Sequence, residues 1–410
     1  MKTNRKDVNM NSKRVATLLL AALMLGFSLA SCGQSTEKVT DNNEAVPSVS
    51  HEEQVPENND ENQQNPISPE DTSADETEGA DITEEPVEEK ITGPVNKLTG
   101  TPTTEKLANQ RPIAIMFNNL KAALPQHGIS EMDVVYEAIV EGSITRLLGL
   151  VTDWETLPDI GSIRSSRDYY IDFCDAHNGI YVHAGGSDIA YQTLWQRGTD
   201  NIDGTNGAYS SASFYRNQER RKKGVSLEHT LFSSGELLSK AVTGLKYTTT
   251  LKDGFVSPFR FSAEQVVLDG QDANYVYIPF STYAQSYFDY NTETGVYDKG
   301  QYVSSKSSLD MHNSPHIDGN NNKQLAFENI VIICTSYRTI DNKGRQAVDF
   351  TGNGKGYYFT DGKCKEIKWS RPTRTGGYTL YEKDGNTELL MNVGKTYVGV
   401  IKNGTEIIYK

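Results

Sequence analysis

The chain has 410 residues, a formal net charge of −14 and 36% hydrophobic residues, which leaves room for about two domains of ~150–200 residues each. The acidity is confined to one stretch, because residues 1–32 contribute +4, residues 33–90 contribute −16, and residues 91–410 carry only −2. The four cysteines include no Cys-x-x-Cys pair, which argues against a zinc site and against thioredoxin-type chemistry.

The N-terminus has the pattern of a bacterial lipoprotein signal peptide. Five basic residues precede the apolar run Val15 to Leu29, which is too short for a comfortable membrane span. The sequence Leu-Ala-Ser-Cys at residues 29–32 resembles a lipobox, at which cleavage frees Cys32 to carry diacylglycerol. The alternative is an ordinary signal peptide with a chance cysteine. We predict a signal peptide over residues 1–31 and lipid anchoring through Cys32 to the extracytoplasmic face of the cell membrane.

The segment that follows has the composition of a disordered linker. Residues 33–90 hold eighteen acidic residues against two lysines, and they contain no Phe, Trp or Tyr. Such a segment buries too little apolar surface to offset its chain entropy, and its like charges extend it. We therefore assign residues 32–109 to a lipidated cysteine and an acidic, disordered linker.

Order is predicted to begin near residue 111, with three apolar segments of strand length at residues 111–117, 133–140 and 146–152. Ser165 is placed to cap a helix that reaches Ala176 and ends at Asn178-Gly179. Residues 180–184 form the next expected strand, and Ser187 caps a second helix. This alternation favours parallel strands with a crossover, and hence an α/β or α+β domain with a partly mixed sheet over residues 110–255.

Beyond residue 254, short Tyr- and Val-rich runs alternate with turn signals, which predicts a mainly β domain over residues 256–410. The expected turns are at residues 298–300, 353–354, 361–362 and 384–385. The basic segment at residues 216–223 has no interleaved aromatic residues, so we interpret it as a solvated helix face or a contact with anionic lipid, and we predict no nucleic-acid partner.

Ordered motifs along the chain resemble the YerB-like lipoprotein family, a bacterial family of unknown function with conserved N-terminal and C-terminal domains. The motifs that carry this resemblance lie at residues 111–119, 125–126, 133–137, 141–146, 161–167, 183–187, 228–233, 315–318, 352–356, 369 and 384–385. The chain departs from the family pattern where Asn118 stands for an acid, Leu124 for an arginine, Ser162 for a proline and Arg371 for a lysine. The resemblance implies a location and an architecture, but no reaction.

The residues around the expected crossover suggest an anion-binding cleft. Ligands of open α/β sheets bind at the carboxyl ends of strands, and His183 lies there, just before a helix N-terminus whose free amides favour anions. Arg164 and Arg167 are three residues apart and can clamp a carboxylate or phosphate from one helix face. The predicted ligand-binding residues are Arg146, Arg164, Arg167, His183, Gly185, Gly186 and Ser187. The alternative is that acids inside the fold pair with the arginines and that His183 is a satisfied core histidine.

Catalysis and metal binding are weaker hypotheses. Glu137, Glu141, His183 and His229 are the candidates for acid or base chemistry. Glu137 and Glu141 on one strand would stand about 13 Å apart at ~3.3 Å per residue, whereas glycosidase pairs need roughly 5 to 9.5 Å. His312, His316 and Asp318 have ligand types at a spacing that suits a metal, but they lie in a segment rich in turn residues. We predict no metal and no cofactor.

The preferred hypothesis is a membrane-anchored binding protein that recognises an anionic envelope component or an envelope protein through the arginine and histidine cleft. The first alternative is a hydrolase or transferase that acts on envelope glycan or peptide. The second alternative is a solute receptor, which is less favoured because the chain does not have two similar α/β lobes.

Overall fold

The computed structural model describes residues 93–304 and 311–410, and it leaves out the side chains of residues 302–313. The predicted signal peptide, the lipidated cysteine and residues 33–92 of the linker lie outside the described residues. Within the described ranges, no helix combines the length and the apolar character needed to cross a membrane.

Twelve of the described strands form one large sheet that draws on both halves of the sequence. The N-terminal half supplies β1 (Ile113–Asn118), β2 (Val134–Ile139), β3 (Thr145–Val151), β5 (Ile180–His183) and β6 (Asn201–Asp203). The C-terminal half supplies β10 (Gln271–Asp272), β16 (Asn329–Thr339), β17 (Gln346–Asp349), β18 (Gly352–Thr360), β19 (Lys363–Arg371), β20 (Thr379–Glu382) and β22 (Thr396–Lys402). Their order is β10-β19-β18-β16-β22-β2-β3-β1-β5-β6, with β17 beside β16 and β20 beside β19.

The two halves meet at β22. This strand is parallel to β16 on one side and to β2 on the other, so that Val398 lies opposite both Val331 and Tyr136. The remaining N-terminal strands combine antiparallel pairs with parallel pairs between β1 and β5 and between β5 and β6. The predicted mixed sheet is therefore confirmed.

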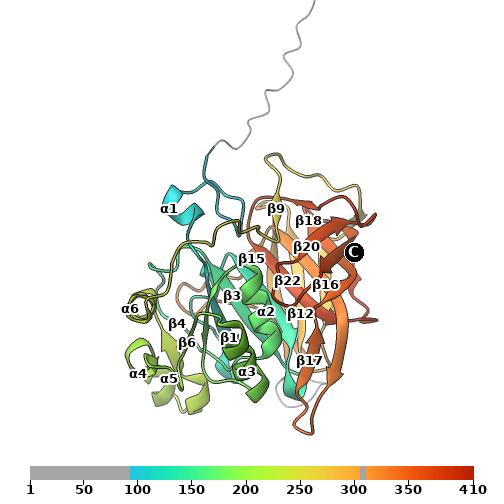
Figure 1. Cartoon of the computed structure of the whole chain (residues 1–410). Coiled ribbons are helices and arrows are strands. Elements are labelled where there is room, and N and C mark those ends of the chain that lie inside the picture. The colour runs from blue at the N-terminus through green and yellow to red at the C-terminus, as the bar shows by residue number, and fades with distance from the viewer. Residues whose placement is uncertain (1–92, 305–310) are drawn as a thin grey trace, which may run out of the picture. The chain divides into compact units, whose positions relative to one another are not determined.

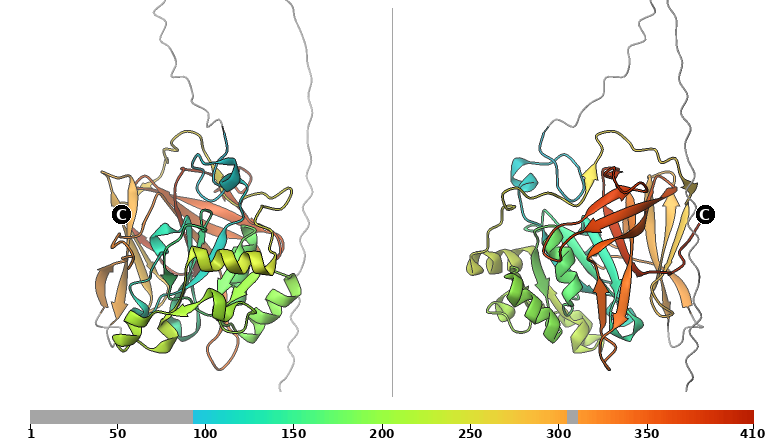
Figure 2. Two further views of the ribbon diagram at one scale, coloured as in Figure 1. Left: turned by 90° about the vertical axis from the view of Figure 1, so that its left-hand side faces the viewer. Right: turned by 45° about the vertical axis from the view of Figure 1, so that its right-hand side comes forward.

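A second sheet comes from the C-terminal half alone. It consists of β11 (Tyr275–Pro279), β12 (Gln285–Asn291), β13 (Val296–Ser304), β14 (Met311–Pro315), β15 (Ala326–Phe327) and β23 (Ile408–Tyr409). The yellow and light-orange strands of this sheet stand beside the large sheet in Figure 2. Smaller sheets join β4 (Ile160–Gly161), β7 (Tyr215–Arg216) and β8 (Leu231–Ser233), and β9 (Arg260–Phe261) with β21 (Leu390–Met391). The prediction of a mainly β C-terminal region is confirmed.

The helices belong almost entirely to the N-terminal half (Figure 1). They are α1 (Glu105–Ala108), α2 (Asp168–Ala176), α3 (Asp188–Arg197), α4 (Ser210–Ser213), α5 (Gln218–Lys222) and α6 (Gly235–Leu245), with the 3-10 turns η1 (Lys121–Ala123), η2 (Ile129–Glu131), η3 (Glu141–Ser143) and η4 (Leu227–His229). The prediction that Ser187 caps α3 is confirmed, because its side chain accepts a hydrogen bond from the amide of Ala190. The predicted start of α2 at Ser165 is wrong, since Arg167 is the N-cap and makes no side-chain capping bond.

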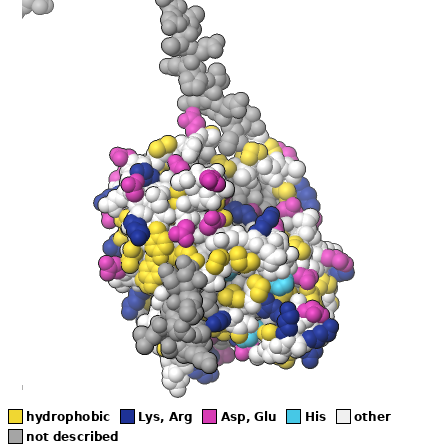
Figure 3. Space-filling view, turned by 180° about the vertical axis from the view of Figure 1, so that it is seen from behind, with side chains coloured by type: hydrophobic (Ala, Val, Ile, Leu, Met, Phe, Trp, Pro, Cys, Tyr) yellow, Lys and Arg dark blue, Asp and Glu magenta, His cyan; other side chains and the backbone are white. Residues whose placement is uncertain are grey.

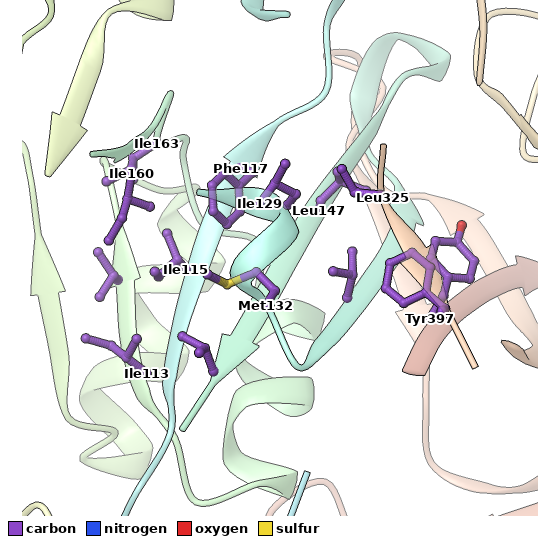
Figure 4. Close-up of a cluster of buried hydrophobic side chains, with 14 of the residues drawn as sticks. Ile113, Ile115, Phe117, Ile129, Met132, Leu147, Ile160, Ile163, Leu325 and Tyr397 are labelled. Carbon is purple, nitrogen blue, oxygen red and sulfur yellow. The ribbon is translucent and has the colours of Figure 1, made fainter. Parts of the chain in front are cut away.

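Both faces of the large sheet are covered, and this explains why its central strands are mostly apolar and do not simply alternate with polar residues. In β1, Ile113, Ile115 and Phe117 join one buried cluster, whereas Ala114 and Met116 join the other. Figure 4 shows the first cluster, which extends to Leu325 and Tyr397. Residues from α2 and α3 fill the second cluster, and residues of the second sheet fill the first.

The segment that precedes β1 is part of the folded body. Residues 93–109, which the sequence assigns to the linker, contain Leu98 with only 2% exposure. The side-chain amide of Asn96 donates to the carboxylate of Asp133 over 3.2 Å, and the backbone carbonyl of Thr99 accepts from the backbone amide of Gly394. This segment therefore connects with both halves, and its Pro and Thr content hid that role.

Two expected turns of the C-terminal half are strand interior. Residues 298–300 lie within β13 and residues 353–354 lie within β18, whereas the turns at residues 361–362 and 384–385 have the expected left-handed backbone at Asp361, Gly362 and Gly385. Strand β13 tolerates Lys299 because that side chain is buried against polar partners in the neighbouring sheet. The polar pattern thus marked a buried network and not a turn.

The three cysteines after residue 32 are buried and free, so no disulfide links the described halves. Instead, a carboxylate on α2 makes ionic contacts with the C-terminal half. Asp172 has no exposed side-chain surface and pairs with Arg197, Arg371 and Arg374 at 2.6, 3.4 and 2.8 Å. These contacts lie on the opposite face of the sheet from the second sheet.

Candidate functional site

Arg164 is the member of the predicted cleft that is nearest to solvent. It lies beyond the carboxyl end of β1, where its amide donates to the carbonyl of Met116. Its guanidinium forms an ion pair of 2.6 Å with Glu228, and the two side chains are 21% and 51% exposed. An exposed pair of this kind is easily exchanged for another partner, because it contributes little to stability.

Arg167 and Arg146 are turned to a different carboxylate. Arg167 donates to both oxygens of Glu141, with a distance of 2.8 Å from its Nε to Oε2. Arg146 approaches the same carboxylate at 3.1 Å and also donates to the carbonyl of Ser165. Burial opposes ionisation of Glu141, but the two arginines outweigh it and lower its pKa from 4.5 to about 2. Arg146 and Arg167, two of the three predicted ligand arginines, are therefore already paired with a carboxylate of the protein.

His183 is a buried histidine with internal partners. Its Nδ1 lies 2.8 Å from the carbonyl oxygen of Gly185, and its Nε2 lies 3.2 Å from Oδ1 of Asn201. Gly185 has a φ of +75° and donates its amide to Asp203. Gly186 pairs with Ser166, and Ser187 caps α3. The segments that carry Arg164 and His183 are neighbours, because the amide of Ala184 donates to the carbonyl of Arg164. The predicted cleft stays a prediction.

His229, a candidate for acid or base chemistry, lies beside the Arg164 pair. Asn118 donates to its Nδ1 over 2.7 Å, which leaves the proton of the neutral ring on Nε2, 3.6 Å from Glu228. Burial lowers the pKa of His229 and favours this neutral form. Asn118, Arg164, Glu228 and His229 thus form a polar edge at the carboxyl end of β1, and we refer to these four residues as the β1 edge.

Glu137 belongs to a second group of polar side chains, which lies between the two sheets. Its carboxylate accepts from Thr145 at 2.7 Å, from Tyr397 at 2.8 Å, from Ser286 at 3.0 Å and from Asn119 at 3.2 Å. Nζ of Lys299 lies 3.6 Å away, and neither charged side chain is more than 1% exposed.

His316 extends this group towards the β1 edge. Lys299 donates to its Nδ1 over 3.1 Å, and its Nε2 donates to the side-chain oxygen of Gln126 over 2.8 Å. The amide nitrogen of Gln126 then donates to the carbonyl of Asn118. Burial and the charge of Lys299 lower the pKa of His316 well below 6.5, which keeps the ring neutral. We refer to Glu137, Lys299, His316 and Gln126 as the inner network.

Two of the three weak candidates for metal binding in the C-terminal half have protein partners. His316 belongs to the inner network, and Asp318 accepts hydrogen bonds from the amides of Gly128, Ser130 and Asn320. The side chain of His312 lies outside the described part of the chain. In that part, no group of three or more His, Cys, Asp or Glu side chains is arranged to hold a metal ion.

A cavity of about 490 Å³ opens beside the inner network. Its lining residues are Lys121, Leu124, Pro125, Gln301, Ser314, Pro315, His316 and Ile317, and we refer to it as the junction pocket. Its two walls follow β1 and β14, so each half of the sequence contributes one wall. Buried Arg220 of α5 fixes the first wall, because it donates to the carbonyls of Ala123 and Pro125. The volume is in the range of small-molecule sites.

A larger hollow of about 720 Å³ lies at the amino ends of the parallel strands β1, β5 and β6. Its two arginines are already paired, because Arg111 lies 2.6 Å from Asp200 and Arg197 contacts Asp172 and Asp175. Ligands of open α/β sheets bind at the opposite ends of the strands. The β1 edge and the junction pocket, which both follow the carboxyl end of β1, are therefore the better candidates.

The sequence interpretation missed several residues of these sites. Asn118 and Gln126 do belong to the family-like motifs, so their positions were marked without their roles. His316 was named as a weak metal candidate and not as a member of a buried network. Lys299 was hidden in an expected turn, and Arg220 was hidden in a basic run that was interpreted as solvated. Gln301 had no signal, because an isolated polar residue in a strand normally faces solvent.

The comparisons with known proteins agree with this two-part organisation. Residues 98–248 match the family model described as the N-terminal domain of a protein of unknown function, DUF3048, and residues 276–398 match its C-terminal domain. The chain is 28% identical over 309 residues to the "Putative lipoprotein YerB" of Bacillus subtilis, which covers 74% of this chain and 85% of the relative. It is also similar to the crystal structure of YerB from Bacillus subtilis, with a TM-score of 0.63 and 25% identity over 77% of this chain and 99% of that one. The resemblance drawn from the motifs is confirmed.

The buried charge pair predicts a measurable coupling. Glu137→Gln and Lys299→Met should each lower the free energy of unfolding by about 3–5 kcal/mol, because each leaves one buried charge without its partner. The double variant should lose less than the sum of the two, with a coupling energy of about 0.5–3 kcal/mol. Urea unfolding of the four proteins gives these values, and strictly additive losses would contradict the pair.

Glu141 predicts a pH dependence. A carboxylate whose pKa falls from 4.5 to about 2 on folding adds stability that is fully present above pH 4.5 and is lost as the pH falls to about 2. The gap in urea midpoint between the wild type and Glu141→Gln should therefore be widest near neutral pH and should close over that range. A gap that stays constant down to pH 2 would show that the arginines do not hold the ionised carboxylate.

Proposed function

Because the chain belongs to the YerB-like family with paired DUF3048 domains, we propose that it is a lipid-anchored protein of the extracytoplasmic membrane face that binds an anionic envelope component. The lipobox-like sequence at Cys32 supports the anchor, as does the printed description of the relative as a lipoprotein. The acidic composition of residues 33–90 suits a spacer between such an anchor and the folded body.

The state of the carboxylates supports binding over hydrolysis, and this observation carries the proposal. A catalytic acid or base needs access to substrate and a pKa near the working pH. Glu141 is held ionised by Arg146 and Arg167, and Glu137 is buried among five internal donors. Neither residue has a free oxygen directed at an open site among the described residues. The hydrolase or transferase alternative is correspondingly weaker.

We place the anion contact at the β1 edge. Arg164 keeps part of its surface exposed and has Glu228 as an exchangeable partner. An incoming carboxylate or phosphate would take the position of Glu228, which now makes a single contact with Nη2, and would form the bidentate contact that a guanidinium favours. Of the predicted ligand residues, only Arg164 then contacts the anion. Arg146, Arg167 and His183 support the loop that positions it.

The anchor predicts a change of location. Cys32→Ser should move the protein out of the membrane fraction of growing cells and should abolish its labelling with radioactive palmitate, because the acceptor thiol is lost. A variant of a buried thiol, Cys334→Ser, serves as the matched control and should remain in the membrane fraction. Unchanged membrane association of Cys32→Ser would contradict the lipid anchor.

The β1 edge predicts a loss of binding. The full chain in detergent should co-sediment with protein-free cell-wall fragments, and Arg164→Ala should lower the bound fraction about tenfold through loss of a charge-assisted contact. Arg260→Ala is the control, because Arg260 is also partly exposed and paired with a glutamate. The proposed site would be wrong if Arg164→Ala bound as well as the wild type, and the proposed function would be wrong if the wild type did not bind.

A further inference from the structure

The junction pocket contains a buried polar group that the fold does not use. Gln301 is only 5% exposed and lines the cavity, yet its side-chain amide has no hydrogen-bond partner among the described residues. The polar atoms of this amide are not among the sealed side-chain atoms that lack a partner, so they are reached from the cavity and not closed off from it. Ser286 and Gln126, two polar side chains that also lie between the sheets, do have partners. Gln301 is therefore available to a ligand that enters the pocket.

The same pocket has an unpaired cation at its rim. Lys121 in η1 is exposed, lines the cavity and forms no ion pair with any described residue. It differs in this respect from Lys363 and Lys365 on β19, each of which has a carboxylate at 2.6 Å. A lysine ammonium is a compact point charge that suits a carboxylate.

The walls between these two polar groups are apolar. Leu124 and Pro125 form the wall from the N-terminal half, and Pro315 and Ile317 form the wall from the C-terminal half. The ring of His316 adds to the floor, and both of its nitrogens are already occupied by Lys299 and Gln126. A ligand therefore meets an apolar slot with one amide at its base and one positive charge at its rim. On the face that Figure 3 shows, exposed hydrophobic side chains in yellow lie among charged ones.

We infer that the junction pocket binds the carboxyl terminus of a short peptide. The side-chain amide of Gln301 can donate a hydrogen bond through its nitrogen and accept one through its oxygen, which matches the C=O and the N–H of a peptide group. The ammonium of Lys121 matches the terminal carboxylate, and the apolar walls accept the last side chain. This inference is independent of the anion contact at Arg164, since it rests on different residues and on a different cavity.

The test uses the full chain in detergent and two probes, acetyl-alanyl-leucine and its C-terminal amide. Isothermal titration should show the acid binding at least about tenfold more tightly than the amide, because only the acid offers a charge to Lys121. In Lys121→Ala the acid and the amide should bind equally, at the affinity that the amide has for the wild type. In Gln301→Leu both probes should bind more weakly than to the wild type. Lys240→Ala, which removes an exposed lysine on α6, should leave both affinities unchanged.

Two results would overturn the inference: a wild type that binds neither probe, and a Lys121→Ala variant that still prefers the acid. Melting temperatures of the variants identify any loss of folding, and Lys121→Ala is expected to melt like the wild type because its side chain is exposed. Binding to cell-wall fragments without binding to the peptides would reject the pocket and would leave the proposed function standing. Peptide binding without binding to cell-wall fragments would support the pocket and would reject the proposed function.

Discussion

The fold depends on the insertion of β22 between β2 and β16. Residues 396–402, near the end of the chain, occupy the centre of the large sheet and pair in parallel with strands from both halves. Without β22, β2 would present an unpaired edge on a strand that is apolar except for Glu137, which is an unstable and aggregation-prone arrangement. The sheet of the N-terminal half is therefore completed only when the C-terminal half is in place. The two matched domains of this family share both buried clusters, since each cluster contains residues of both halves.

The same pairing creates the polar interior. Tyr397 on β22 and Glu137 on β2 face the second sheet, where Lys299 meets them from β13. Burying an ion pair costs desolvation energy that its attraction barely repays, so a pair of apolar residues would give a similar or higher stability. The pair does, however, select the register of β13 in the second sheet. A shift of β13 by one residue would turn Lys299 to the other face of that sheet and away from Glu137. The inner network in this way fixes how the second sheet docks, and with it the walls of the junction pocket.

Local patterns predicted most of the secondary structure of the N-terminal half. The apolar runs of β1, β2 and β3 and the serine cap of α3 depend on neighbouring residues in sequence, so they are visible without a structure. The pairing of β2 with β22 joins residues about 260 positions apart along the chain, and no local periodicity encodes it. The boundary drawn at residues 255 and 256 remains a prediction, but the large sheet runs across it.

The candidate site was predicted less well, and the reason is physical. Arginines and histidines at the ends of strands serve ligands and internal carboxylates equally well, and the sequence does not show which carboxylate is near. Glu141 takes Arg146 and Arg167, whereas Glu228 takes Arg164, so three similar residues have different exposure. Lys299 lies in a segment whose Asp, Lys and Gly residues are typical of turns, and only its partners in the other sheet explain its burial. Sites built across two sheets are not visible in local composition.

Native-state hydrogen exchange of the full chain measures whether the shared sheet is one cooperative unit. The account predicts that the backbone amides of β2, β16 and β22 open with one common free energy, equal to that of global unfolding, because no part of the sheet is stable alone. Amides of β16 and β22 that open at a distinctly lower free energy than those of β1, β2 and β3 would contradict it. In that case the two halves would be separate folding units that merely touch, and the inner network would not hold them together.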